Sequence, residues 1–245
     1  LAGAQYSLAD MLYKGRGGPK DEVEARRLLG LAAAQGNEWA QCQLAYMLAE
    51  GHGGPKDEVE ARRLLGLAVA QGNVAAPCGL AAMLLQGHGG PEDKVEARRL
   101  FGLAAAQGTA KAQSILAGML AEGHGGPKDE VEARRLLRLA AARGDKLAQC
   151  GLADMLSEGR GGPKDEVEAR RLLGLAAAEG NAEAQCNLAG MLNLGRGGPK
   201  EEVEARRVLG LAAAQGHEWS QCELARMLRE GRGGPKDEVE ARRLF

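Results

Sequence analysis

Five cysteines are the residues best suited to redox or metal chemistry, and all five share one register of a repeated sequence. The register is occupied by Cys42, Cys78, Cys150, Cys186 and Cys222. Neighbouring members would lie on adjacent packed helices, about 8–10 Å apart. A disulfide needs Cα atoms within about 7 Å, and zinc needs ligands that converge on one ion. We therefore expect five reduced, largely buried thiols and no metal site, which favours a reducing compartment.

Three histidines occupy a second register, at His52, His88 and His124, where the other copies carry arginine. Exchange between His and Arg is typical of an exposed polar position. The histidines lie one repeat apart and no carboxylate cluster joins them, so the sequence predicts no metal site here either.

A glycine-rich segment, residues 15–21, superficially resembles a phosphate-binding loop. It lacks the Gly-Lys-Ser/Thr ending, it follows a predicted helix instead of a strand, and it recurs seven times. We interpret it as a turn. Carboxylates recur at helix starts and beside arginines, and no nucleophile–base pair stands out. The sequence therefore predicts no catalytic residues, no cofactor and no enzyme.

The elements that must position these residues belong to an internal repeat. The string GGPKDEVEARR, or a near copy, starts every 36 residues from Gly17 to Gly233, without insertion or deletion. We predict one domain, residues 1–245, made of stacked units that bury their apolar faces against one another. The units are 1–36, 37–72, 73–108, 109–144, 145–180, 181–216 and the incomplete 217–245.

The sequence pattern of each unit predicts two helices and no strand. In the second unit, Asn37 is an N-cap type and precedes a helix (helix A) with apolar residues at i, i+4, i+7 and i+8. Gly51 ends helix A. Asp57 starts a second helix (helix B), with Glu60 three residues on in a capping-box arrangement. Gly72 closes helix B, so the expected class is all-α.

Three departures from the repeat carry finer expectations. The N-cap register holds good cap types in five of six copies, with His217 as the exception. Pro77 stands at the fourth position of its helix A, so that helix should start late or bend. Helix B carries an interior glycine in five of six copies, and the sixth has Arg138, which indicates an exposed position.

Charged residues of helix B have helical spacing. Glu58 and Arg62 are four residues apart, and Glu60 and Arg63 are three apart. We expect both pairs to lie on a solvated face of the helix.

Composition excludes several classes of partner. Lys and Arg number 32 against 33 Asp and Glu, a net charge of −1, so nothing favours nucleic acid or acidic membranes. No apolar run approaches the roughly 18 residues of a membrane span, and no signal peptide is visible. We expect a cytoplasmic location.

One stripe of helix A varies between copies while the rest changes little. The variable positions are the third, seventh, tenth and fourteenth of the unit, which fall within an arc of about 60°. In the second and last units they hold Trp39, Gln43, Tyr46, Glu50, Trp219, Glu223, Arg226 and Glu230. We predict that this stripe binds a partner, with the aromatic residues as anchors and the polar residues as the rim. The alternative, that any exposed face drifts freely, stays open.

The repeat resembles the Sel1-like repeat family, which has a TPR-like fold, over the whole chain. In the first unit the residues that match the family pattern are Ala4, Gln5, Tyr6, Leu8, Met11, Gly15, Gly17, Asp21, Ala25, Ala32, Ala33, Gln35 and Gly36. The departures are Ala9, Leu12, Gly18, Leu28 and Leu29. The resemblance implies a right-handed α/α solenoid in which helix A lines the concave face, and an adaptor or scaffold role without catalytic residues.

Two functions therefore remain open. The first is a scaffold that binds a protein or peptide in the groove lined by helix A. The second is a structural element that self-associates end to end, because an apolar interface that a neighbouring repeat normally covers would be open at each end.

Overall fold

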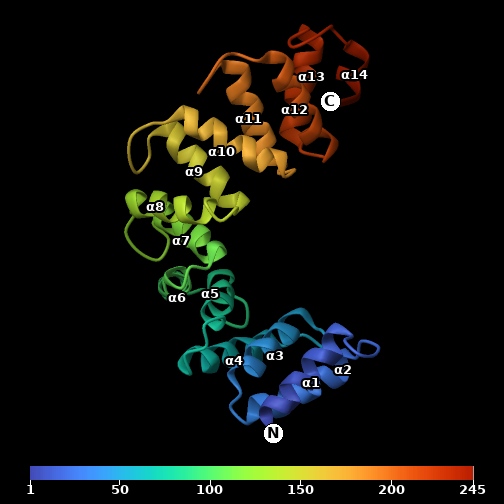
Figure 1. Cartoon of the computed structure of the whole chain (residues 1–245), viewed down its shortest axis with the longest axis vertical. Helices are drawn as coiled ribbons and strands as arrows, with labels where there is room; N and C mark the ends of the chain where they lie inside the picture. The colour runs from blue at the N-terminus through green and yellow to red at the C-terminus, as the bar shows by residue number, and fades with distance from the viewer. Residues whose placement is uncertain (245) are drawn as a thin grey trace. The chain divides into compact units, whose positions relative to one another are not determined.

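The computed structural model describes residues 1–244, which form fourteen α-helices and no strand. This confirms the all-α fold with two helices per repeat. Helix A of each repeat is an odd-numbered helix and helix B an even-numbered one (Figure 1). The end of the seventh repeat at Phe245 lies outside the described residues.

The contacts divide the chain into two compact units, Leu1–Pro127 and Lys128–Phe245. The prediction of a single domain over residues 1–245 stays a prediction. The first unit contains α1 (Ala2–Lys14), α2 (Glu22–Ala34), α3 (Glu38–Glu50), α4 (Glu58–Ala70), α5 (Ala76–Gln86), α6 (Lys94–Ala106) and α7 (Ala110–Glu122). The second contains α8 (Glu130–Ala141), α9 (Lys146–Glu158), α10 (Glu166–Ala178), α11 (Ala182–Leu194), α12 (Glu202–Ala214), α13 (Glu218–Glu230) and α14 (Glu238–Leu244).

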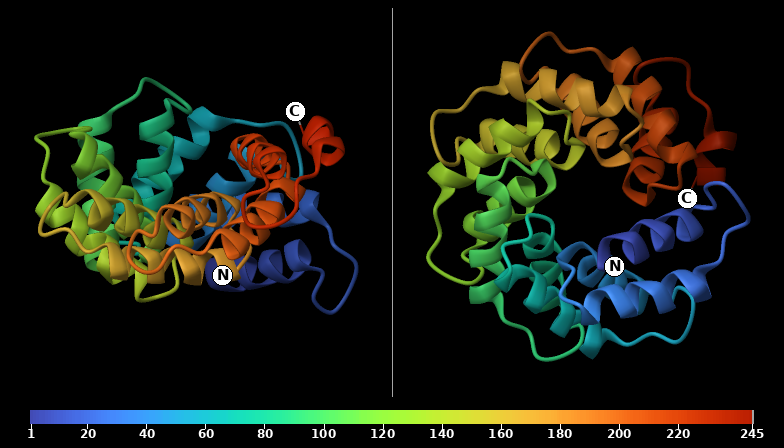
Figure 2. Two further views of the ribbon diagram at one scale, coloured as in Figure 1. Left: turned by 90° about the horizontal axis from the view of Figure 1, so that it is seen from above. Right: turned by 60° about the horizontal axis from the view of Figure 1, so that its bottom comes forward.

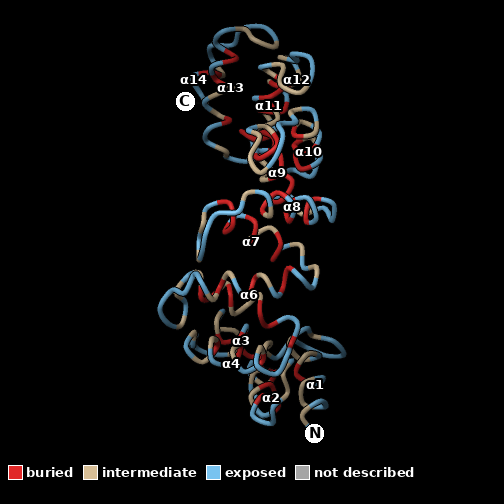
Figure 3. Tube along the Cα trace, turned by 90° about the vertical axis from the view of Figure 1, so that its left-hand side faces the viewer, coloured by how far each residue is buried: buried red, intermediate tan, exposed pale blue. Residues whose placement is uncertain are grey.

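Within each unit, every helix packs against the helix before it and the helix after it (Figure 2). The buried residues are mainly Leu, Ala and Met, and they recur along the inner sides of successive helices (Figure 3). Alanines such as Ala25 and Ala61 are fully buried. Small side chains at these positions let the helices approach closely, so the core needs few aromatic residues.

Helix B starts as the sequence predicts, but the capping box is incomplete. The Asp57 carboxylate accepts a hydrogen bond from the Glu60 backbone N–H at 2.9 Å. The Glu60 side chain does not return to Asp57; it accepts two hydrogen bonds of 2.7 Å from Arg63. The expected Glu60–Arg63 pair is therefore confirmed, and it takes the carboxylate that a capping box would use.

The caps of helix A differ from the prediction at two positions. Asn37 caps α3 through the Ala40 N–H at 2.8 Å, as expected. Thr109 makes no side-chain cap, although its residue type predicts one. His217, expected to be the exception, does cap α13, because its Nδ1 accepts the Ser220 N–H at 3.3 Å.

The late start expected at Pro77 is confirmed. α5 begins at Ala76, and the Asn73 side chain still accepts the N–H groups of Ala75 and Ala76. The Asn73 side chain therefore satisfies two backbone N–H groups at the start of the shortened helix.

The loop between helices A and B is held by the preceding repeat. Arg62 was expected to pair with Glu58, but its guanidinium donates to the Pro91 carbonyl of the next loop at 2.9 Å. The same contact recurs in every described repeat junction. Its donors are Arg26, Arg98, Arg134, Arg170 and Arg206, which bind Pro55, Pro127, Pro163, Pro199 and Pro235 at 2.8–2.9 Å. Arg62 is thus a tie between repeats (the Arg–Pro tie) and not a member of a solvated pair.

Two glycines allow the loop to dock this closely. Gly89 has φ +68°, and a Cβ there would lie 2.2 Å from the Glu58 carbonyl oxygen of the preceding repeat. A Cβ on Gly90 would lie 2.7 Å from Nη1 of Arg62. Glycine is therefore required at both positions because a side chain would collide with the neighbouring repeat. At Gly89 the left-handed backbone conformation is a second reason for glycine.

Replacing Gly89 with Ala should lower stability by about 2 kcal/mol or more, because the added methyl group collides with backbone that cannot move freely. The control is Gly102→Ala in the middle of α6, where an added Cβ meets nothing within 4 Å. That change should stabilise by about 0.5–1 kcal/mol through helix propensity. Urea unfolding followed by far-ultraviolet circular dichroism measures both, and equal stability of the two variants would contradict the docking role.

Candidate protein-interaction surface

The predicted stripe is accessible on α3. Trp39 and Tyr46 are about half exposed, Glu50 is exposed and Gln43 is partly buried. Positions between them, such as Ala40 and Leu44, are buried in the core. The four stripe residues therefore belong to the solvent face of α3.

An aromatic cluster extends this face, and the sequence analysis missed it. The His52 ring lies 5.6 Å from the Tyr46 ring and 5.8 Å from the Tyr13 ring, measured between centroids. Lys20 Nζ lies 5.0 Å from the Tyr13 centroid. Burial and the neighbouring Tyr46 raise the pKa of Tyr13. The only sequence signal was that Tyr13 and Tyr46 lie in successive helices A and His52 in the loop after the second.

On α13 the stripe residues Trp219, Glu223 and Arg226 line a cavity of about 210 Å³. Its inner wall is apolar, with Cys186 and Ala189 of α11 and Leu209 of α12. Trp219 and Leu194 also line it and are 70 % and 69 % exposed. Because most of each side chain is exposed, the two form an open apolar edge.

Gly190 keeps this cavity open. It stands at the tenth position of its repeat, where α3 carries Tyr46 and α13 carries Arg226. A Cβ added at Gly190 would meet nothing within 4 Å. The space that larger residues fill in other repeats is therefore free here.

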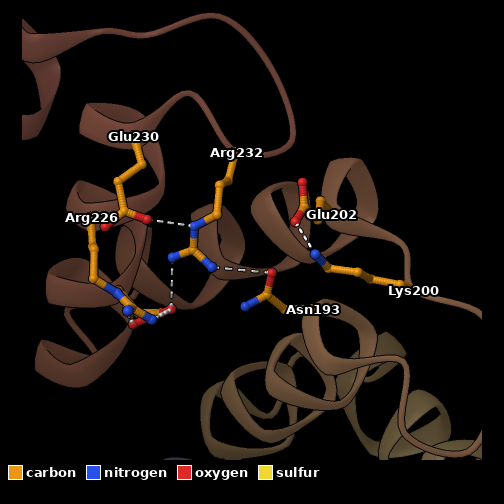
Figure 4. Close-up of polar contacts among 7 residues, drawn as sticks. Asn193, Lys200, Glu202, Arg226, Glu230 and Arg232 are labelled. Carbon is orange, nitrogen blue, oxygen red and sulfur yellow. Dashed lines mark hydrogen bonds and ion pairs between the residues drawn. The ribbon is translucent and has the colours of Figure 1, made fainter.

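A polar network includes three of the residues that line the cavity, Asn193, Glu223 and Arg226, and Figure 4 shows its contacts. Arg226 forms a bidentate pair with Glu223, and Arg232 lies 3.6 Å from Glu223 and 2.7 Å from Glu230. Arg232 also donates to Asn193 Oδ1 at 3.3 Å. The predicted rim residues of α13 are thus paired, Glu223 with Arg226 and Glu230 with Arg232, so the rim is close to neutral. The sequence analysis missed Arg232 and Asn193, whose pairing crosses from one repeat to the next.

The structure places the two predicted Trp anchors in different units. Trp39 belongs to the unit Leu1–Pro127 and Trp219 to the unit Lys128–Phe245. Each is therefore described with its own unit: in the first, Trp39 and Tyr46 lie with the Tyr13–His52 cluster, and in the second, Trp219 lines the cavity.

The cysteines are free thiols, as predicted, but they are not uniformly buried. Cys150 and Cys186 are buried, Cys42 and Cys78 are partly buried, and Cys222 is exposed, which corrects the expectation for that residue. α13 packs against α12 and α14 in the described residues, and Cys222 lies on a part of α13 that these two helices leave exposed.

Burial sets the chemistry of the inner thiols. It raises the pKa of Cys42 and of Cys150 to about 11. The Cys42 thiol donates to Asn73 Oδ1 at 3.3 Å, which links one helix A to the N-cap of the next. These cysteines therefore serve as small core residues that also bind a neighbouring cap.

Iodoacetamide at pH 8 should modify Cys222 first and Cys42 and Cys150 last. A thiol with a pKa near 11 is only about one part in a thousand thiolate at pH 8, and the thiolate is the nucleophile. The rates at Cys42 and Cys150 should rise as the pH approaches 11. Mass spectrometry of tryptic peptides gives the order, and urea-unfolded protein, in which all five should react alike, is the control. Equal rates in the folded protein would contradict this account.

Residues 1–244 contain no group of three or more His, Cys, Asp or Glu side chains placed to hold a metal ion. Among the described helices, none combines the length and apolar character needed to cross a bilayer.

Stacked helix pairs with an exposed, variable face on helix A define the class of α-solenoid repeat proteins. The family comparison agrees with this class, since the Sel1 repeat model matches seven stretches: residues 2–37, 40–73, 75–109, 110–145, 146–181, 182–217 and 220–245. The chain belongs to the Sel1 repeat family, which confirms the resemblance seen in the sequence.

Two solved structures are similar to the whole chain. One is a protective antigen present in uropathogenic Escherichia coli strains that displays an SLR fold, with TM-score 0.91 and 29 % identity; the match covers 100 % of this chain and 52 % of that one. The chain thus spans about half the length of that antigen. The other is a Sel1 repeat protein from Oxalobacter formigenes, with TM-score 0.87 and 28 % identity over 98 % of this chain and 94 % of that one. The comparison with curated proteins found no match.

Proposed function

We propose that this chain is a scaffold that binds protein or peptide segments on the exposed face of helix A. Sel1-repeat proteins are generally protein-interaction scaffolds, and their solenoid fold is typically non-catalytic. The partner-binding residues are the two stripes described above. Trp39 and Tyr46 anchor one surface, and Trp219 anchors the other.

The observation that carries the proposal is the open edge of the α11–α13 cavity. Trp219 and Leu194 are large apolar side chains, each more than two thirds exposed, that line a cavity with an apolar wall. Exposed apolar groups beside a cavity with a polar rim are typical of recognition sites, and Trp is enriched among the residues that dominate binding energy. The cavity has room for one apolar side chain of a partner.

The contrast between the variable stripe of helix A and the constant charged residues of helix B is weaker support for a binding role than the sequence alone indicated. The constancy of Arg62 and its equivalents follows from the Arg–Pro tie, so it says nothing about which face is functional. Glu60 and Arg63 stay constant as a local ion pair. The support therefore comes from the exposure of the aromatic residues and from the cavity.

The test uses peptides selected from a random phage-displayed library on the immobilised chain. Trp219→Ala should weaken the selected peptides by about 2 kcal/mol, the loss typical of a hot-spot residue. Leu147→Ala is the matched control, since Leu147 holds the same register on α9 and is also exposed. Isothermal titration calorimetry measures the affinities. Unchanged binding by Trp219→Ala, together with loss on charge reversal at Glu204 and Arg207 of helix B, would place recognition on the opposite face.

A second candidate function, end-to-end self-association, is favoured by the outer face of α1. Leu8 and Met11 are 49 % and 44 % exposed, whereas their equivalents Leu44 and Met47 on α3, which packs against α2 and α4, are 9 % and 0 % exposed. This apolar surface has the composition of a junction between repeats.

If this face mediates self-association, light scattering of the 245-residue chain should show a mass that rises with concentration in the micromolar range. Replacing both Leu8 and Met11 with Gln should remove the association, because it removes the apolar area that drives contact. A strictly monomeric species at high micromolar concentration would rule this candidate out, and the Leu147→Ala variant controls for general changes in surface hydrophobicity.

A further inference from the structure

The cavity beside Trp219 has a counterpart one repeat earlier, and that counterpart is acidic. Trp219, at the third position of its repeat on α13, and Gly190, at the tenth position on α11, both line the cavity. In the preceding junction, between α9 and α11, the same two positions hold Glu183 and Asp154. Two carboxylates therefore occupy the positions that carry an aromatic ring and a glycine in the next junction.

These two carboxylates are close to each other. The Cys150 thiol of α9 donates to Asn181 Oδ1 at 3.9 Å, and Asn181 is the N-cap of α11, two residues before Glu183. The pKa of Cys150 is raised by burial and then by the charges of Glu183 and Asp154, so both carboxylates lie near this thiol. Desolvation also raises the pKa of Asp154, Glu183 raises it further, and the opposing effect of Arg160 is smaller. The exposed side chains of Asp154 and Glu183 therefore form a pair of like charges (the acidic pair).

The acidic pair is not neutralised by the described residues around it. Asp154 and Glu183 belong to none of the ion pairs of the described chain, and every cation of α9, of α11 and of the loops after them is bound to another carboxylate. These ion pairs are Lys146 with Glu179, Arg160 with Glu130 and Glu158, Lys164 with Glu166, Arg196 with Glu166, and Lys200 with Glu202. On α13, Arg226 pairs with Glu223, and Arg229 does not line the cavity. The acidic pair thus leaves the surface beside the cavity with an excess of negative charge.

One extended ligand can reach both features. The acidic pair and the cavity lie in successive junctions, so they are roughly 10 Å apart, the spacing of neighbouring helices. A polyproline II segment has three residues per turn and rises about 3.1 Å per residue, so side chains three residues apart share one face at about 9 Å. Such a segment can place an apolar side chain in the cavity and a cation on the acidic pair.

We propose that the partner of the Trp219 surface is a basic peptide segment, with Arg or Lys three residues from an apolar side chain. This inference rests on the proposed scaffold function and adds the chemical class of the partner. The apolar side chain enters the cavity beside Trp219, and the cation binds Asp154 and Glu183. An arginine suits this site best, because its guanidinium has enough donors for two carboxylates.

The probe is the capped peptide N-acetyl-Arg-Gly-Gly-Leu-Gly-Gly-Arg-amide, which carries a cation on each side of the leucine and therefore fits either chain direction. Titrated into the ¹⁵N-labelled full chain, it should shift and saturate the Trp219 indole N–H signal in NMR spectra. The Trp39→Phe variant assigns that signal, since the chain has two Trp residues. The analogue with Gln in place of both Arg should bind about tenfold more weakly, because it lacks the charge-assisted hydrogen bonds. The analogue with Glu should bind more weakly still, and the preference for Arg should decrease as ionic strength rises.

A charge-reversed variant tests the acidic pair with residues that other repeats carry at the same positions. Lys111 holds the third position of its repeat, and Arg226 holds the tenth. The double variant Asp154→Arg and Glu183→Lys should therefore fold, bind the Arg peptide about tenfold more weakly and prefer the Glu analogue. Far-ultraviolet circular dichroism checks the fold.

The matched control is Glu238→Gln, which removes one exposed carboxylate from α14, a helix B of the same unit. It should leave the preference for the Arg peptide unchanged. If the double variant of the acidic pair also kept that preference, the proposal would be overturned.

The outcomes separate this inference from the proposed function. Equal affinity for the Arg and Gln peptides, both weakened by Trp219→Ala, would overturn the inference and leave the scaffold function intact. Absence of a saturable shift of the Trp219 indole signal with all three peptides would count against both. In the library selection, enrichment of Arg and Lys among the peptides that depend on Trp219 supports the inference, and their absence contradicts it.

Discussion

The hydrogen bond from an arginine of helix B to a proline carbonyl in the next loop is the contact on which the arrangement of repeats depends. The Arg26 guanidinium reaches the Pro55 carbonyl across 29 residues of sequence at 2.9 Å. Its planar fork of donors suits backbone oxygens better than an ammonium group would. The two glycines before the proline lack the Cβ atoms that would hold the loop away, so the sequence of the loop and that of the helix are constrained together.

Rules that read one helix at a time recovered the repeat, both helices and most caps. These rules gave the wrong partner where a side chain can bond either to a residue in its own helix or to one in the next repeat. Arg62 has Glu58 four residues away, but its guanidinium donates to the Pro91 carbonyl, which the docked loop of the next repeat brings within 2.9 Å. Thr109 and His217 show the same limit, since cap preference by residue type gives only an average tendency.

The sequence predicted which positions of helix A form the exposed stripe, but it did not predict all the residues that surround this stripe. The stripe positions follow from helical geometry, so their exposure was predictable. Arg232, Asn193 and His52 lie in loops or at helix ends, and their contacts join successive repeats, which helical periodicity does not describe. The exposure of Cys222 was not predictable for a related reason: the Cys42 thiol, in the same register, bonds to Asn73 of the following repeat, and periodicity within one helix does not describe such contacts.

From the second repeat on, each loop is held by the repeat that precedes it, which gives the chain a direction. During synthesis the arginine of helix B leaves the ribosome before the loop that it will bind, because Arg26 precedes Pro55 in the chain. A newly made loop therefore meets a partner that is already present, and its helix pair can add to a folded stack. Assembly can thus keep pace with translation from the amino end, and no repeat needs to wait for residues that have not yet been made.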